Sequence, residues 1–379
     1  METVTKKKIT VVVNGRFHAF DYASVLYKQN KLHRLISSMP YSLAKKYNID
    51  KEHYRGLPVF EVIKRLWRLL FKREPPVLFY AKLFTKTALA FVPNDTEIVI
   101  SFAGYSEEIF NSPKLNGVMK ILDRGSTHTL SNIKLNKLAA EYHNIKWEPH
   151  PKLFIERELR EYDLADKILI PSSFVKQTFI ENGISADKLM QILYAVGAKK
   201  FTKLKVNSEK RETAVLFVGQ ISPRKGIGVL LNAMKLVREK IPGAVLWLVG
   251  HKNELTENSL LEKPWIKHFG ILKGQELFDK YNQASVFCLL SFEEGLALVL
   301  TEALHCGLPV VATPNTGAED IVYQKKDCFI VPVGDHEKAA EKIIEALEKT
   351  QSNISANEKN YDMSWEKFCE ILINKIWRK

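Results

Sequence analysis

The sequence has few cysteines and no long apolar run. Its four cysteines, Cys288, Cys306, Cys328 and Cys369, show no CxxC spacing. They therefore indicate neither a zinc site nor a disulfide framework, and a reducing cytoplasm is the expected compartment. The longest apolar runs, such as AVLFV and LALVL, are far shorter than the roughly 18 residues that a membrane-spanning helix needs. No transmembrane helix is expected.

Leader-like and repetitive segments are also missing. The first residues, METVTKKKITVVVNG, contain an apolar stretch of only about five residues, which predicts a first strand after a tail rather than a signal peptide. There is no internal repeat and no low-complexity tract. A hydrophobic content of 46% with 26% charged residues excludes a disordered or fibrous chain. At roughly 100–200 residues per domain, the 379 residues predict two or three domains.

Positive charge is concentrated in the first half of the chain. Residues 1–200 hold 32 Lys and Arg against 20 Asp and Glu, whereas residues 201–379 hold 24 against 23. Such a one-sided field favours an anionic partner, namely acidic lipid, nucleic acid or a phosphorylated substrate. No nucleic-acid-binding module is recognisable and the cations are spread over many segments, so nucleic acid is not expected as a partner.

Short apolar runs alternate with helical patterns throughout, which is typical of parallel α/β sheets. Strands are expected at 9–13, 97–102, 118–122, 167–171, 189–194, 213–218, 244–249, 284–290, 309–312 and 328–331. The series restarts near 213, after the polar stretch KLKVNSEKRET, the candidate linker. The predicted fold is two tandem Rossmann-like, doubly wound domains that face each other across a cleft. Their expected ranges are 1–205 and 210–355, followed by a helix in 356–379 that packs on its own domain or crosses back to the first.

The stretch 291–322 contains a predicted strand-to-helix turn flanked by two acids. Glu294 and Glu302 are separated by seven residues, and Gly295 follows the first of them. Free backbone N–H groups at a helix start attract anions. The spacing therefore indicates two carboxylates and several amides converging on one ligand that carries phosphate and hydroxyls. The alternative is that both acids are solvent-exposed.

A second stretch, 215–228, places two cations at the end of a predicted strand. Gly219 allows a ligand to approach the backbone closely. Arg224 and Lys225 follow, and an Arg fork beside a Lys point charge suits a diphosphate. The alternative is a solvated basic turn, and KGIG does not form a GxGxxG fingerprint.

Together these stretches resemble the nucleotide-sugar-dependent glycosyltransferases of family 4, which have the GT-B architecture. The matching segments are FVGQISPRKG, WLVGHK, FGILKGQELFDKYNQASVFCLLS and EEGLALVLTEALHCGLPVVATPNTGAED, in the order of the family. The resemblance covers roughly 210–340 closely and the remainder loosely. One turn departs from the family pattern, because EGLALV replaces EGFGLP and Ala297 stands in place of the second Gly.

The resemblance implies a donor site in the second domain. It assigns Glu294 to hydroxyls of the donor sugar, Glu302 to the ribose, and Arg224 and Lys225 to the diphosphate beside Gly219. Its base-contacting loop corresponds to Gly270, Ile271 and Leu272, and its amide-rich turn to Gly295, Leu296 and Ala297. Glu294, Arg224 and Lys225, together with His128 of the first domain, form the catalytic set that it implies. Family members of this kind retain anomeric configuration without a DxD metal site, and no DxD is present here. No cofactor or metal is therefore expected.

The first domain offers candidates for the acceptor side. Gly15, Arg16 and His18 follow the first strand, and they could contact acceptor or phosphate or simply form a surface loop. His128 follows another predicted strand and matches loosely the family histidine that touches the donor sugar. His150 has no comparable context, and we expect it to be structural.

Residues 59–73, VFEVIKRLWRLLFKR, combine an amphipathic helical pattern with five cations. Such a helix is typical of binding to a membrane surface, and the alternative is a core-packed helix with a solvated basic face. A lipid-linked acceptor and a peripheral location on the inner face of the plasma membrane follow as expectations.

The leading functional hypothesis is a retaining transferase that uses a UDP-sugar, with GDP-mannose as the second candidate, in cell-surface polysaccharide or glycolipid synthesis. A sugar-nucleotide epimerase of related architecture is one alternative. A non-catalytic protein that binds nucleotide sugar or an anionic surface is another.

Overall fold

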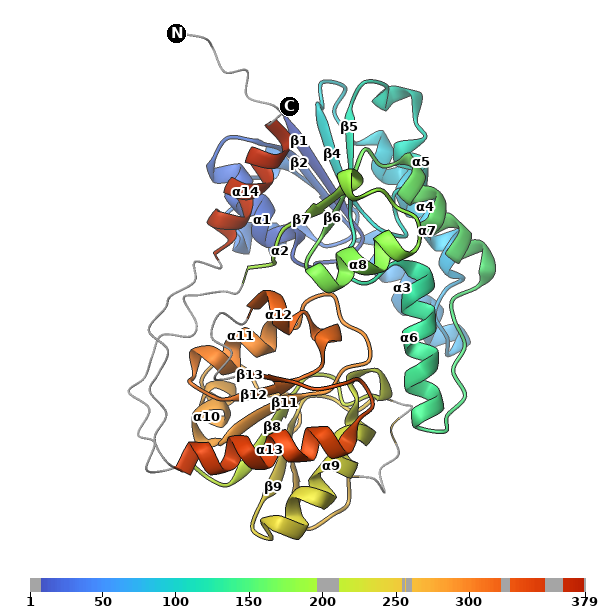
Figure 1. Cartoon of the computed structure of the whole chain (residues 1–379). Helices are drawn as coiled ribbons and strands as arrows, with labels where there is room; N and C mark the ends of the chain where they lie inside the picture. The colour runs from blue at the N-terminus through green and yellow to red at the C-terminus, as the bar shows by residue number, and fades with distance from the viewer. Residues whose placement is uncertain are drawn as a thin grey trace.

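The structure is a computed structural model that describes residues 8–195, 211–253, 256, 261–321, 328–351 and 364–377. The described chain forms two α/β domains, each built around one parallel sheet (Figure 1). This arrangement confirms the predicted fold of tandem doubly wound domains. Most of the candidate linker KLKVNSEKRET lies outside the described residues.

The first domain contains a seven-stranded sheet of order β3-β2-β1-β4-β5-β6-β7. Its strands are β1 (Ile9–Val13), β2 (Leu32–Ser37), β3 (Tyr54–Gly56), β4 (Ile98–Phe102), β5 (Met119–Asp123), β6 (Lys167–Ile170) and β7 (Leu189–Gln191). The helices are α1 (Ala19–Lys28), α2 (Tyr41–Lys46), α3 (Val59–Phe71), α4 (Val77–Ala90), α5 (Glu107–Phe110), α6 (Thr129–Tyr142), α7 (Lys152–Leu164) and α8 (Ser173–Glu181).

The second domain contains a six-stranded sheet of order β10-β9-β8-β11-β12-β13. Its strands are β8 (Ala214–Val218), β9 (Val245–Val249), β10 (Ile266–His268), β11 (Val286–Leu289), β12 (Val310–Ala312) and β13 (Cys328–Ile330). The helices are α9 (Ile227–Lys240), α10 (Gln275–Gln283), α11 (Leu298–His305), α12 (Ala318–Ile321) and α13 (His336–Gln351).

Continuous apolar sequence forms the central strands because helices cover both faces of each sheet. Every residue of β1 and of β8 is buried. The sequence prediction missed β2, β3 and β10. In β2, His33 and Arg34 interrupt the apolar run and are only partly buried, which hides the strand in the sequence. The other two strands contain three residues each.

The strand orders place a topological switch point in each sheet. Chain order reverses between β1 and β4 in the first sheet and between β8 and β11 in the second. Ligands of open α/β sheets bind at the carboxyl ends of the strands at such points. The loops after β1, β5, β8 and β11 are therefore the segments from which a site would be built.

The last helix, α14 (Trp365–Trp377), packs against α1 of the first domain rather than beside α13 (Figure 1). The Phe368 ring stacks on Tyr22 with 5.7 Å between ring centroids, and the Cys369 thiol donates to the Tyr22 carbonyl at 3.5 Å. Leu372 is fully buried. The chain thus leaves the first domain, builds the second and returns to the first.

This return predicts that α14 stabilises the first domain. Replacing Leu372 with Ala should lower the free energy of unfolding by about 2–5 kcal/mol, because it leaves a cavity under α1. Lys375→Ala on the exposed face of α14 is the matched control. Denaturant unfolding checks this, and equal stability of the two variants would contradict the described packing.

Candidate active site

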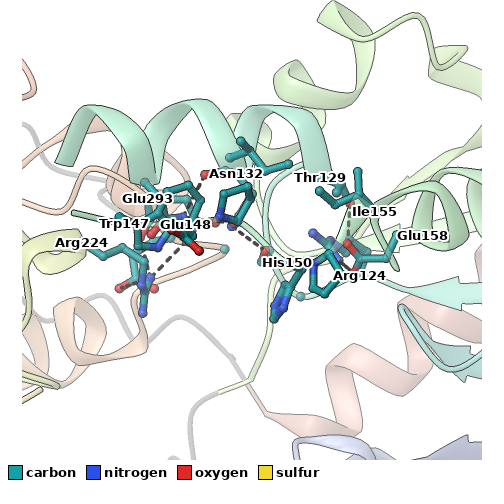
Figure 2. Close-up of a pocket in the computed structure, with 18 residues that line it drawn as sticks. Arg124, Thr129, Asn132, Trp147, Glu148, His150, Ile155, Glu158, Arg224 and Glu293 are labelled. Carbon is teal, nitrogen blue, oxygen red and sulfur yellow. Dashed lines mark hydrogen bonds and ion pairs between the residues drawn. The ribbon is translucent and has the colours of Figure 1, made fainter. Parts of the chain in front are cut away.

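A cavity of about 670 Å³ lies between the two domains (Figure 2). From the first domain it is lined by α6, the loop 147–151 and α7. From the second domain it is lined by Arg224 and the loop 293–295. In Figure 2 Arg224 and Glu293 lie at one end, near Trp147, and Arg124 and Glu158 lie at the other. The walls are mostly polar, which suits a hydroxyl-rich ligand.

Glycine holds the cation pair at the switch point of the second sheet. The loop after β8 continues into a short 3₁₀ turn, Pro223–Lys225, and then into Gly226 with φ +72°. A Cβ on Gly226 would lie 2.0 Å from the carbonyl oxygen of Leu290, just after β11. Only glycine fits this close approach, so the turn that carries Arg224 is fixed against the end of β11.

Arg224 and Lys225 both face the acids after β11. Arg224 Nη1 donates to the Glu293 carbonyl at 2.7 Å and to Glu293 Oε2 at 3.2 Å. It also lies 3.7 Å from Glu294 Oε1, and Lys225 forms an ion pair with the same oxygen. Burial and the neighbouring Arg224 lower the pKa of Lys225. Lys225 is thus a largely desolvated cation, and an anion beside it interacts more strongly than it would in water.

The acid that links the domains is Glu293, which the sequence analysis did not single out. It is 3% exposed. Its Oε1 accepts hydrogen bonds from the Thr127 hydroxyl at 2.8 Å and from the Thr127 amide at 3.3 Å, both in the first domain. Its other oxygen accepts from Arg224. The EE doublet was the available signal, but only the distant Thr127 shows which acid turns inward.

The turn that follows Glu294 touches the first domain directly. A Cβ on Gly295 would lie 1.8 Å from the Gly125 carbonyl oxygen, and the Ser172 hydroxyl donates to the Gly295 carbonyl at 2.6 Å. Leu296 and Ala297 are buried, and the Ala297 amide donates to the Thr316 carbonyl at 3.0 Å. The Ala297 amide is therefore already used inside the domain. The contact between the domains requires glycine at position 295, because a side chain there would collide with Gly125.

Further contacts bridge the domains away from the cavity. Asp320 of α12 accepts from the Ser173 amide and hydroxyl at 2.7 and 2.8 Å, and from the Gln191 side chain at 3.1 Å. On the other side, His143 Nε2 accepts from the Gly228 amide at 2.9 Å. These bonds hold the domains in a closed arrangement.

The other residues predicted for the donor lie at the carboxyl edge of the second sheet. Gly219, at φ +148°, follows β8, and the neighbouring Gly250 amide donates to the Gly270 carbonyl at 2.7 Å. Ile271 is exposed and Leu272 packs partly against the core. Glu302 of α11 accepts from the Tyr281 hydroxyl at 2.8 Å. None of these residues lines the 670 Å³ cavity, so the predicted donor residues form two groups along one edge.

His128 does not reach the cavity. It is the N-cap of α6, and its Nδ1 accepts from the Leu130 amide at 3.3 Å. Its ring is buried between Tyr162 and Phe179, with centroids 4.9 and 5.1 Å away. Burial, with the charge of Arg124, lowers the pKa of His128 to about 4. His128 is 2% exposed and does not line the cavity, so this placement gives no support to its assignment to the catalytic set, which stays a prediction.

The loop after β1 splits its three candidates. Arg16 turns away from the cleft and donates to the Tyr47 hydroxyl, with its Nε at 3.0 Å. His18 instead turns toward the end of β5, where its Nε2 lies 2.9 Å from Asp123 Oδ2. Gly15, at φ +111°, accepts from the Ser37 hydroxyl. His18 is thus the member of the three whose side chain reaches the end of β5.

The loop 147–151 adds residues that sequence reasoning left out. Trp147, Glu148 and His150 line the cavity, although His150 was expected to be structural. Asn132 and Asn136 of α6 line the same wall. An indole face beside amides and a carboxylate is a surface on which a sugar can stack and bond. Their sequence context, between two helices, offered no motif. Within the described ranges, no cluster of three or more His, Cys, Asp or Glu is arranged to hold a metal ion.

Comparison with known families places this site in context. Residues 199–363 match the family model described as glycosyl transferases group 1. The chain is 29% identical over 217 residues to sulfoquinovosyl transferase SQD2 of Arabidopsis thaliana, covering 53% of this chain and 41% of that protein. It is 28% identical over 217 residues to O-antigen chain mannosyltransferase B of Escherichia coli, covering 50% and 56%. The match thus spans about half the length of these curated relatives.

The similarity in structure extends over nearly the whole chain. A crystal structure of a variant of TarM from S. aureus, in complex with fondaparinux, α-GlcNAc-glycerol and UDP, aligns with a TM-score of 0.66. The alignment covers 98% of this chain and all of that one at 12% identity. At this identity the likeness concerns the fold, and the two-domain GT-B arrangement is common to both.

The contact at Gly295 predicts that domain closure is sensitive to one methyl group. Gly295→Ala would overpack the contact with Gly125, at a cost of about 1–3 kcal/mol, and shift the chain roughly tenfold or more toward an open arrangement. The radius of gyration from small-angle X-ray scattering should rise. Gly243→Ala is the control, since a Cβ there meets nothing within 4 Å. An unchanged radius for Gly295→Ala would disprove the close approach.

The buried cap predicts a pH-dependent stability. Because the pKa of His128 is about 4 in the folded chain and about 6.5 when unfolded, the unfolded state binds more protons between these values. The contribution of His128 to the free energy of unfolding is therefore fully present above pH 6.5. It falls by up to about 3 kcal/mol as the pH drops toward 4. His128→Asn keeps an N-cap acceptor and should lose this component. Unfolding curves at pH 7.5 and 5 measure it, and parallel pH profiles of both proteins would contradict it.

Proposed function

Because residues 199–363 match the model of the group 1 glycosyl transferases and the chain has the GT-B fold, we propose that it is a retaining hexosyltransferase. It moves a sugar from a nucleotide sugar to a glycan or lipid-linked acceptor. The observation that carries the proposal is the cation pair Arg224–Lys225, held beside Glu294 at the β8–β11 switch point, with Arg224 lining the cavity between the domains.

The cation pair is the proposed diphosphate site. Arg224 offers a planar fork and Lys225 a point charge, which together suit two adjacent phosphates. Without ligand, Glu293 and Glu294 together balance the charge of the two cations. A diphosphate would take over this role and keep Lys225 charged against its burial. Glu294 would then be free to accept hydrogen bonds from hydroxyls of the donor sugar.

The nucleoside half is proposed to lie along the edge from Gly219 to Gly270. Glu302, oriented by Tyr281, would accept from the ribose hydroxyls, and the backbone of Gly270, Ile271 and Leu272 would meet the base. UDP is the favoured nucleotide because the TarM complex, which shares the fold, contains UDP. GDP-mannose remains the second candidate.

The proposed reaction uses neither a covalent nucleophile from the protein nor a bound metal ion. The bond from the anomeric carbon to the diphosphate oxygen breaks while Arg224 and Lys225 stabilise the charge on the departing phosphate. The acceptor hydroxyl attacks the anomeric carbon from the same face, forms the new glycosidic bond and passes its proton to the departing diphosphate oxygen. One well-aimed donor to such developing charge is worth about 2.7–4 kcal/mol. The acceptor would occupy the wall formed by Trp147, His150 and the asparagines of α6.

The setting of the reaction is proposed from the relatives. The E. coli relative is named as a mannosyltransferase of the O-antigen chain. We therefore propose assembly of a cell-surface polysaccharide or glycolipid on the cytoplasmic side of the membrane.

The test is release of nucleotide from a panel of UDP-, GDP- and ADP-sugars. Wild type should act on one donor, with or without EDTA, and Arg224→Ala and Glu294→Ala should each lower the rate about 100-fold or more. Arg160→Ala, which removes a surface guanidinium paired with Glu107, should match wild type.

Three outcomes would contradict the proposal. An unchanged rate in Arg224→Ala would remove the diphosphate assignment. Isomerisation of the nucleotide sugar without release would favour the epimerase. Tight nucleotide binding with no turnover of any donor would favour the non-catalytic alternative.

A further inference from the structure

Helices α3 and α4 expose a group of large apolar side chains, here called the α3–α4 apolar surface. It consists of Val59, Val62, Leu66, Leu69, Leu70 and Phe71 on α3, with Phe79 and Leu83 on α4. Leu69 is 76% exposed and Leu70 is 72% exposed. Single exposed apolar residues are ordinary, but a contiguous group of this size marks an interaction surface.

This exposure argues against the core-packed interpretation of residues 59–73. Phe60 is the residue of α3 that is buried, with edge-to-face contacts to Tyr80 and Phe84 at 5.7 and 5.2 Å between centroids. A core-packed helix would bury its wide apolar stripe. Here the stripe faces outward, so α3 is anchored through a narrow edge and presents its broad apolar face to the surroundings.

Cations surround the apolar surface. Residues 59–90 hold seven Lys and Arg but only two acids, Glu61 and Glu74. Those acids pair with Lys64 and Arg68 at 3.5 and 2.6 Å. The exposed cations Arg65, Lys72, Arg73, Lys82 and Lys86 complete the set. An apolar face flanked by excess positive charge matches an anionic lipid surface in both hydrophobicity and charge.

We infer that the α3–α4 apolar surface docks on an anionic lipid bilayer, with its apolar side chains at the headgroup–acyl boundary and its cations on lipid phosphates. α3 contains 13 residues and lies on the membrane, since crossing it takes about 20. In the described part of the chain, no helix is long and apolar enough to span a bilayer. A second copy of the chain fits this surface less well, because two surfaces of excess positive charge would repel each other.

Hydrogen bonds connect α3 and α4 to the carboxyl edge of the first sheet. The Tyr80 hydroxyl of α4 donates to the Phe60 carbonyl at 3.2 Å and lies 3.5 Å from Asn14 Oδ1. Asn14 directly follows β1, at the switch point of the first sheet. The Ser38 hydroxyl, just after β2, donates to Glu61 of α3 at 2.6 Å. Helices α3 and α4 thus lie beside the carboxyl edge of the first sheet. Docking there would present the acceptor side of the cleft to lipids.

Vesicle flotation of the full-length chain tests the inference. Wild type should float with vesicles of 70% phosphatidylcholine and 30% phosphatidylglycerol at 50 mM salt, and much less with pure phosphatidylcholine or at 500 mM salt. Leu69→Ser with Leu70→Ser should lower the partition coefficient about tenfold or more. Arg65→Gln with Lys72→Gln should lower it about fivefold for each cation removed.

Matched controls replace exposed residues of the same kind elsewhere on the first domain. Leu153→Ser with Ile180→Ser controls the apolar pair, and Lys137→Gln with Lys146→Gln controls the cationic pair. Both controls should float like wild type. Circular dichroism melting of every variant should match wild type, which separates loss of binding from loss of folding.

The inference is overturned if wild type does not float with anionic vesicles, or if the α3 variants float as well as their controls. It is also overturned if light scattering shows a wild-type dimer that Leu69→Ser with Leu70→Ser dissolves, since a second copy would then be the occupant. Flotation is measured without any nucleotide sugar. If flotation fails, the proposed transfer reaction is unaffected. If the transfer reaction fails its own test, the docking inference is likewise unaffected.

Discussion

The closed arrangement of the two domains depends on the buried carboxylate of Glu293. It accepts from Thr127 of the first domain and from Arg224 of the second, and it is nearly inaccessible to water. An acid in such a place is costly unless both of its oxygens have partners, and breaking a buried pair costs about 3–5 kcal/mol. Domain closure and the position of Arg224 are thus one constraint. If the first domain moved away, the cation proposed to hold the diphosphate would lose part of its support.

Two close backbone approaches refine this constraint. Gly226 lets the cation-bearing turn lie against Leu290, and Gly295 lets the acid-bearing turn lie against Gly125. The first approach positions charge within the second domain, and the second brings the domains together. They also explain why the departure at Ala297 is tolerated. The Ala297 amide bonds to Thr316 inside the domain, and the close approach needs glycine only at position 295.

Much of the fold could be predicted from the sequence because the central strands are buried on both faces. Continuous apolar runs such as ITVVV and AVLFV leave little ambiguity. β2 was not predicted because its two polar residues, which are only partly buried, interrupt the apolar run. The ordering of motifs along the second domain also located Arg224, Lys225, Glu294 and Glu302. Local sequence carries these features, since each lies next to a strand end or helix start.

Features that depend on partners distant in the chain could not be predicted in this way. Glu293, rather than Glu294, forms the bridge between the domains. Its partner Thr127 lies 166 residues away in the sequence, so no local pattern could identify the contact. His128 resembles a site residue by position, yet Tyr162 and Phe179 enclose it. The periodicity of residues 59–73 predicts an apolar stripe on α3. It does not indicate whether other residues bury that stripe. Each of these outcomes is decided by tertiary neighbours.

The central claim is that Arg224 anchors the diphosphate of a nucleotide in the cleft. Calorimetric titration with the nucleoside diphosphate of the active donor, and with the matching nucleoside, isolates the diphosphate contribution. The account predicts that wild type binds the diphosphate much more tightly than the nucleoside. Arg224→Ala should remove at least tenfold of that difference while nucleoside affinity stays the same. An undiminished preference for the diphosphate in Arg224→Ala would contradict the account.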